Sequence, residues 1–108
     1  MKIAVSATGG SLSAKVSEQF GRCAYFIIID SETMKWVPIS NPALGSKGGA
    51  GVEAAKLIAN NGAEVVLTGS VGPNAEAALK AAGIKIVTGF SETKTVKEAV
   101  EEYLKNKE

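Results

Sequence analysis

The 108-residue sequence contains no histidine, one cysteine and one aspartate. Without histidine, the chain lacks the commonest general base and the commonest metal ligand. The single cysteine, Cys23, excludes an internal disulfide bond and any cysteine-cluster metal site built by one chain. Because Asp30 is the only aspartate, we do not expect the converging carboxylates that a two-metal nuclease needs. We therefore expect a binding protein and not an enzyme.

The sequence also lacks an excess of charge of one sign and any long apolar run. Twelve basic and eleven acidic side chains give a formal net charge of +1, without the concentrated positive surface of a nucleic-acid-binding protein. The first apolar run, Ile3 to Val5, is too short for a signal peptide, and no later run approaches the length of a membrane span. We expect a cytoplasmic protein with no nucleic-acid or membrane partner, folded as a single domain over residues 1–108.

The order of apolar runs predicts an α/β fold. Runs at Tyr25 to Ile29 and Trp36 to Ile39 predict a hairpin, and Pro38 places the second strand at a sheet edge because proline cannot donate to a central ladder. The strand–helix–strand unit from Val65 to Val87 requires a right-handed crossover between parallel strands. With a first strand at Lys2 to Ala7, these elements predict a mixed five-stranded sheet in the order 3-2-1-4-5. Helices are expected from Val52 to Asn60, from Pro73 to just before Gly83, and after a capping box at Thr95 and Glu98.

Glycine follows three of the predicted strands, at Thr8-Gly9-Gly10, Thr68-Gly69 and Thr88-Gly89. If these strands are parallel, their loops gather at the carboxyl end of the sheet, where open α/β sheets bind ligands. Glycine there lets backbone N–H groups approach an anion closely. Ordinary tight turns use glycine equally, so the sequence leaves both interpretations open.

Three loops are expected to line one crevice. The loops at Thr8 to Ser11 and at Thr68 to Asn74 should face each other, with the glycine-rich loop Gly45 to Gly51 beside them. That glycine-rich loop should be the most mobile one when no ligand is bound. Helices begin directly after it and after Gly72, so two helix N-termini could also receive an anion.

The dipeptide Arg22-Cys23 is the sharpest local feature of the sequence. An adjacent guanidinium favours the thiolate form of cysteine, and a thiolate is a soft ligand for iron and related metals. Because Cys23 lies in the long connection after the first strand, we expect it to be accessible to solvent. The alternative is a small buried side chain beside Phe20, since free cysteine is among the most buried residue types.

Several motifs together resemble those of a known family. They are Phe20-Gly21-Arg22-Cys23-Ala24-Tyr25-Phe26, Asn41-Pro42, Gly49-Ala50-Gly51, and the run from Thr68 to Ala75 with its helix ending at Ala82-Gly83-Ile84. This ordered set is similar to the dinitrogenase iron-molybdenum cofactor biosynthesis family over nearly the whole chain. The resemblance implies a ribonuclease-H-like three-layer α/β fold, an iron-sulfur or iron-molybdenum cluster as cofactor, and a cofactor-assembly protein as partner. Family members often carry a histidine where this chain has Gly48-Gly49.

The resemblance and the glycine pattern together give a set of candidate site residues. Cys23 is the candidate metal ligand, by its position in the family motif. The candidate cofactor-binding residues are Thr8, Gly9, Gly10, Arg22, Gly48, Gly49, Gly51, Gly69, Gly72 and Asn74.

Two functions remain open from the sequence. The first is a carrier that holds an anionic metal cluster, or its precursor, transiently through Cys23 and backbone N–H groups. The second is a metal-free binding or regulatory module for a small organic or phosphate-bearing anion at the same glycine loops. In either case we expect a monomer or a weak homodimer.

Overall fold

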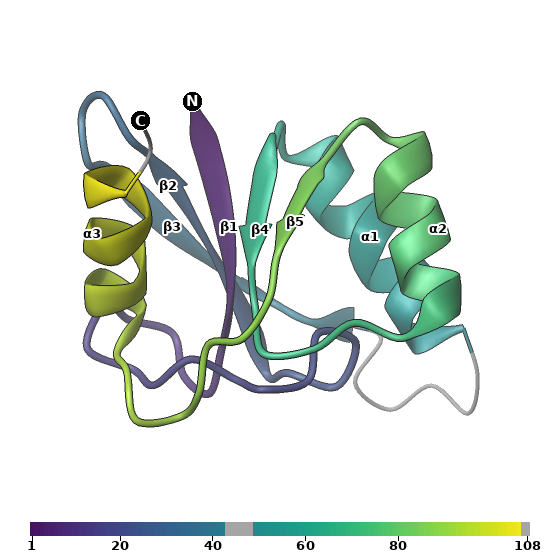
Figure 1. The fold of residues 1–108 in the computed structure, drawn as a ribbon, viewed down its shortest axis with the longest axis horizontal. Helices are drawn as coiled ribbons and strands as arrows, with labels where there is room; N and C mark the ends of the chain where they lie inside the picture. The colour runs from purple at the N-terminus through teal and green to yellow at the C-terminus, as the bar shows by residue number, and fades with distance from the viewer. Residues whose placement is uncertain (43–48, 107–108) are drawn as a thin grey trace.

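The computed structural model describes residues 1–42 and 49–106. The described residues form one sheet with helices on both of its faces, which makes three layers (Figure 1). None of the helices in this part of the chain is long and apolar enough to cross a membrane. The elements are β1 (Lys2–Ala7), β2 (Tyr25–Asp30), β3 (Trp36–Ser40), α1 (Ala50–Asn60), β4 (Val65–Leu67), α2 (Pro73–Ala81), β5 (Lys85–Val87) and α3 (Val96–Lys105).

The strand order is β3-β2-β1-β4-β5, as the sequence predicts. β1 and β4 are parallel, as are β4 and β5, whereas the β2–β3 hairpin is antiparallel and β2 also runs antiparallel to β1. Pro38 faces Ile27 on the edge strand β3, where its missing N–H disrupts no second ladder. The prediction that β3 is an edge strand is therefore confirmed.

The two faces of the sheet bury two separate apolar cores. Side chains alternate across a strand, so in β1 Ala4 faces one core while Ile3 and Val5 face the other. Helices α1 and α2 cover the first core, and α3 covers the second (Figure 1). Both cores reach β1 and β4, whose residues in the sheet are almost wholly buried.

Helices α1 and α2 both begin at a glycine. Gly49 caps α1 in the left-handed region, with φ +72°, and its carbonyl accepts from the N–H of Glu53 at 2.9 Å. The helix therefore begins at Ala50, two residues before the predicted start. α2 follows Gly72 with Pro73 in its first turn, as predicted, because proline has no N–H to leave unsatisfied there.

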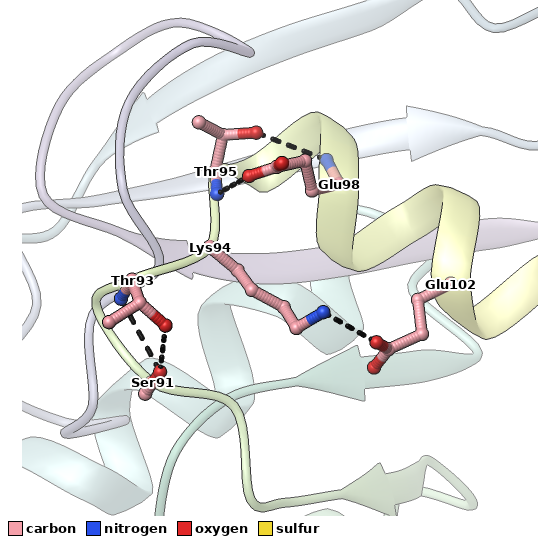
Figure 2. Close-up of polar contacts among 6 residues, drawn as sticks. All are labelled: Ser91, Thr93, Lys94, Thr95, Glu98 and Glu102. Atoms are coloured by element: carbon pink, nitrogen blue, oxygen red, sulfur yellow. Dashed lines mark hydrogen bonds and ion pairs between the residues drawn. The ribbon is translucent and has the colours of Figure 1, made fainter.

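A polar network orders the chain where it enters α3 (Figure 2). The Thr95 hydroxyl accepts from the Glu98 N–H at 3.1 Å, and the Glu98 carboxylate accepts from the Thr95 N–H at 2.8 Å. This is the predicted capping box, and the hydrogen bond from the Thr95 N–H to the carboxylate is the main cause that lowers the pKa of Glu98. One turn further, Lys94 donates to Glu102 at 2.6 Å.

The connection from β1 to β2 is long, contains no helix, and crosses from one face of the sheet to the other. Its first half lies against α3: the N–H groups of Val96 and Lys97 donate to the carbonyls of Ala14 and Leu12. Its second half crosses the carboxyl end of β4, where the Ser70 N–H donates to the Glu18 carbonyl at 2.8 Å. The crossing brings residues 19–22 beside the starts of α1 and α2.

Candidate functional site

An open cleft of about 420 Å³ lies at the carboxyl end of the sheet, on the face covered by α1 and α2. Three segments line it: residues 19–22 from the crossing connection, residues 49–52 at the start of α1, and Ser70 with residues 72–75 at the start of α2. This is the position at which open α/β sheets bind ligands. The lining residues are Gln19, Phe20, Gly21, Arg22, Gly49, Ala50, Gly51, Val52, Ser70, Gly72, Pro73, Asn74 and Ala75.

Two helix N-termini open into this cleft. Neither Gly49 nor Gly72 has a side chain that could cap its helix, and no side-chain cap is present at the N-terminus of α1 or of α2. The first-turn N–H groups of a helix have no intrahelical acceptors and carry partial positive charge. The arrangement therefore favours an anion between the two helices.

Arg22 strengthens the preference for an anion. It is exposed, and it is the only charged residue among the described residues that line the cleft. Its guanidinium carries a positive charge and presents several N–H donors. The cleft thus combines one full positive charge with two partial ones.

Close glycine contacts hold the three segments together. A Cβ atom on Gly51 would lie 2.7 Å from the Cβ atom of Ala75, and one on Gly21 would lie 2.9 Å from the backbone of Gly51. Gly69 plays a similar part behind the cleft, since its Cβ would lie 2.5 Å from the Cα atom of Glu18. At these positions glycine allows close packing of the backbone. Sequence reasoning had considered only ligand approach and tight turns for the glycine loops.

The structure brings together only some of the predicted site residues. Arg22, Gly49, Gly51, Gly72 and Asn74 all line the cleft. Gly69 does not; it packs against the crossing connection instead. Gly48 and the rest of residues 43–48 lie outside the described residues, as does most of the loop for which mobility is predicted.

The prediction that Thr8 to Ser11 lines the same crevice is wrong. After β1 the chain turns toward α3, and the Thr8 N–H and hydroxyl both bind the Lys15 carbonyl, at 2.9 and 3.1 Å. A Cβ on Gly10 would contact Tyr25 and Pro38 on that same side. Thr8, Gly9 and Gly10 are therefore absent from the cleft, because the tertiary packing of α3 draws their loop to the opposite face.

Cys23 is buried, so the prediction that it is accessible is also wrong. Its side chain is 2% exposed in the core beneath α1 and α2, beside Phe20 and Phe26. The thiol donates to the Phe20 carbonyl at 3.2 Å. Burial is the main cause that raises the pKa of Cys23 to about 12, against the predicted thiolate. Its neighbour Arg22 lines the cleft, whereas the Cys23 thiol lies in the interior.

No other conventional metal site replaces Cys23. Within residues 1–42 and 49–106, no group of three or more histidine, cysteine, aspartate or glutamate side chains could hold a metal ion. A ligand of this cleft would therefore be bound by charge and hydrogen bonds, and any metal in it would need to bring its own ligands.

Burial of Cys23 predicts both its reactivity and a pH dependence. A thiol reagent should label the unfolded protein rapidly and the native protein very slowly, because the thiol is buried and protonated. The unfolded thiol ionises near pH 9, but the folded one does so only near pH 12. Burial of the neutral thiol therefore makes its full contribution to the free energy of unfolding below pH 9. Above pH 9 this contribution falls by about 1.4 kcal/mol per pH unit.

The Cys23→Ala variant is the control for this pH effect. Denaturant titrations should show wild type to be more stable than the variant at pH 8, with the difference shrinking as the pH approaches 10.5. Rapid labelling of the native thiol, or a constant difference across this range, would contradict the burial of Cys23.

Sequence reasoning named neither Asn41 nor Gln19 as a site residue, and it placed Ser70 at the cleft only as part of the loop Thr68 to Asn74. Asn41 is 4% exposed and hydrogen-bonds to the backbone of the crossing connection, while Gln19 and Ser70 line the cleft. The available signal for Asn41 was its place between an edge strand and a proline, where an asparagine side chain can satisfy turn carbonyls. Gln19 carries no comparable signal, because only the crossing of two chain segments brings it beside Ser70.

Comparison with known proteins identifies the family. A model of the dinitrogenase iron-molybdenum cofactor family matches residues 1–106. The chain belongs to this family. One relative, an uncharacterized protein of Methanocaldococcus jannaschii, is 31% identical over 96 residues, which cover 86% of this chain and 80% of that protein.

Two solved structures of similar proteins extend this family assignment. The apo form of the orange protein from Desulfovibrio gigas is 43% identical, with a TM-score of 0.93, covering 96% of this chain and 87% of that one. A Thermotoga protein described as a candidate NifB protein is 32% identical, with a TM-score of 0.81, covering 97% and 88%. Both similarities cover nearly the whole of this chain, so these two proteins share its fold.

Proposed function

We propose that this protein is a cytoplasmic, non-enzymatic carrier that holds an anionic iron-sulfur or iron-molybdenum cluster, or its precursor, in the cleft. The observation that carries the proposal is the meeting of two uncapped helix N-termini with Arg22 in a cleft that has no thiolate or imidazole. The family name supplies the iron-molybdenum cofactor as the class of cargo. A relative solved in an apo form supports the idea that such proteins also exist with a ligand bound.

The chemistry of the cleft favours a cluster that is already complete. Sulfide-rich clusters of iron or molybdenum carry net negative charge, so helix N-termini and a guanidinium stabilise them without any metal–protein bond. We therefore do not retain Cys23 as a ligand, because its thiol lies in the core and is protonated. Cargo held by charge alone can leave quickly, as transfer to a cofactor-assembly protein requires. We expect the carrier to act as a monomer or a weak homodimer.

We also propose that the protein has a ribonuclease-H-like fold. The strand order 3-2-1-4-5 with helices on both faces is the basis on which we group the protein with ribonuclease-H-like folds. Nuclease chemistry does not follow from that grouping, since the described residues provide no cluster of carboxylates for metals.

Anaerobic reconstitution tests the proposal. The protein is mixed with a preformed iron-sulfur cluster, or with tetrathiomolybdate, a dianion of molybdenum and sulfide, and then desalted. We expect visible absorption and metal to remain with the protein, and binding to weaken as the salt concentration rises. Metal and absorption that elute entirely with the salt would refute the carrier function.

Binding measurements with a second anion test the second candidate function, a metal-free module for a small anion. Helix N-termini bind phosphate as readily as other anions, which is the observation that favours it. In this case inorganic phosphate or a phosphate ester should bind to the cleft and tetrathiomolybdate should not.

A further inference from the structure

Two buried side chains hold the backbone of residues 20–23, which carries Arg22. The Asn41 carboxamide donates to the Gly21 carbonyl at 3.2 Å and to the Cys23 carbonyl at 2.9 Å. The Cys23 thiol donates to the Phe20 carbonyl at 3.2 Å. Three carbonyl oxygens of one short segment are thus bound from the interior of the protein.

This pattern fixes the direction of the N–H groups between those carbonyls. The carbonyl and the N–H of one trans peptide unit point in opposite directions, and the described chain contains no cis peptide bond. Because the Phe20 and Gly21 carbonyls are held from inside, the N–H groups of Gly21 and Arg22 point outward. Gly21 and Arg22 both line the cleft, so these N–H groups add to its positive character.

Asn41 is itself fixed and hard to replace. Its side chain is 4% exposed, and its own N–H donates to the Ala24 carbonyl at 3.0 Å. Only a carboxamide of this length can donate two hydrogen bonds from this place, since a carboxylate has no donor and alanine has no polar group. Gly21 packs directly on the backbone of Gly51, so a shift of residues 20–23 would also disturb the start of α1.

We propose that Asn41 is a positioning residue of the cleft. It sets the affinity for an anion by orienting the backbone of Gly21 and Arg22, without touching the ligand itself. This inference rests on the proposed function, because it concerns the same cleft and the same class of anionic ligand.

Anion affinity measured in matched variants tests the inference. Asn41→Ala should bind tetrathiomolybdate at least about tenfold more weakly than wild type, the effect of one lost interaction of ~1.4 kcal/mol. Ser6→Ala is the control, since Ser6 is fully buried and its Oγ lies 2.7 Å from both the Ser17 carbonyl and the Thr68 hydroxyl, away from the cleft. It should lose stability in the same way and keep wild-type affinity. Equal affinities in wild type and Asn41→Ala would overturn the inference.

A double-mutant cycle with Arg22→Gln gives a readout that a purely structural residue would not move. Asn41 binds the carbonyls on both sides of Arg22 and so also holds the backbone from which the Arg22 guanidinium projects. The two substitutions should therefore be less than additive in their effect on affinity. Strictly additive effects would overturn the inference. Should Asn41→Ala not fold, Asn41→Ser retains one donor, and its affinity should fall between those expected of wild type and the alanine variant.

Amide hydrogen exchange of the ligand-free protein separates this inference from the proposed function. Exchange at Phe20, whose N–H donates to the Ser70 carbonyl at 3.2 Å, should be faster in Asn41→Ala, and unchanged in Ser6→Ala, whether or not any anion binds. If wild type fails to bind tetrathiomolybdate, the carrier function is wrong, and the exchange rates alone decide whether Asn41 positions the segment. Unchanged exchange at the Phe20 amide would overturn the inference.

Discussion

Replacement of Gly69 by alanine should lower the free energy of unfolding by about 3 kcal/mol, a large share of the stability of a domain this size. The added Cβ would lie 2.5 Å from the Cα atom and 2.6 Å from the carbonyl oxygen of Glu18. Neither atom can move freely, because the Glu18 carbonyl accepts from both the N–H and the hydroxyl of Ser70. Thermal and denaturant unfolding of the variant would measure the loss, with a decrease in melting temperature of about 13 °C.

Gly72→Ala is the matched control for this prediction. Gly72 follows the same strand, has a φ of −72° that alanine adopts readily, and has open space where its Cβ would lie. Its stability should stay within about 1 kcal/mol of wild type. If Gly69→Ala and Gly72→Ala unfold alike, the close contact between Gly69 and Glu18 does not hold the crossing connection in place.

Reversal of the charge at Arg22 should weaken binding of tetrathiomolybdate about 100-fold, which corresponds to ~2.7 kcal/mol. The substitution Arg22→Glu replaces the only charged residue of the described cleft lining by an anion facing the ligand. Since Arg22 is exposed, the melting temperature should change little. Titrations at low and high salt measure the effect, and the difference between the two proteins should shrink as screening increases.

Lys35→Glu controls for net charge, because it makes the same change at the opposite end of the sheet. The carbonyl of Lys35 accepts from the N–H of Asp30, where β2 ends beside the start of β1. This variant should keep nearly wild-type affinity. Equal weakening by Arg22→Glu and Lys35→Glu would show that the anion responds to overall charge and not to the cleft.

The strands and helices were predictable because local chemistry decides them. Pro38 restricts β3 to an edge, the crossover from β4 to β5 requires parallel neighbours, and Thr95 with Glu98 starts α3. The start of α1 differed by two residues because the left-handed conformation of Gly49 ends the preceding loop earlier than the apolar period suggests. The α/β class and the sheet order thus follow from residues whose effects on structure are local in the sequence.

The candidate site was predictable only in part, because it depends on contacts between distant segments. The sequence alone determined the anion-favouring elements: two helices that begin at glycine, the charge of Arg22, and the lack of histidine and of clustered cysteine. The tertiary structure decided which of these elements meet. In the folded chain Thr8, Gly9 and Gly10 lie on the side of α3, and Cys23 lies in the core. The physical reason is that burial and the face on which a loop packs depend on what covers the sheet. The helices concerned begin only later in the sequence: α1, which covers Cys23, at Ala50, and α3, which packs on the loop after β1, at Val96.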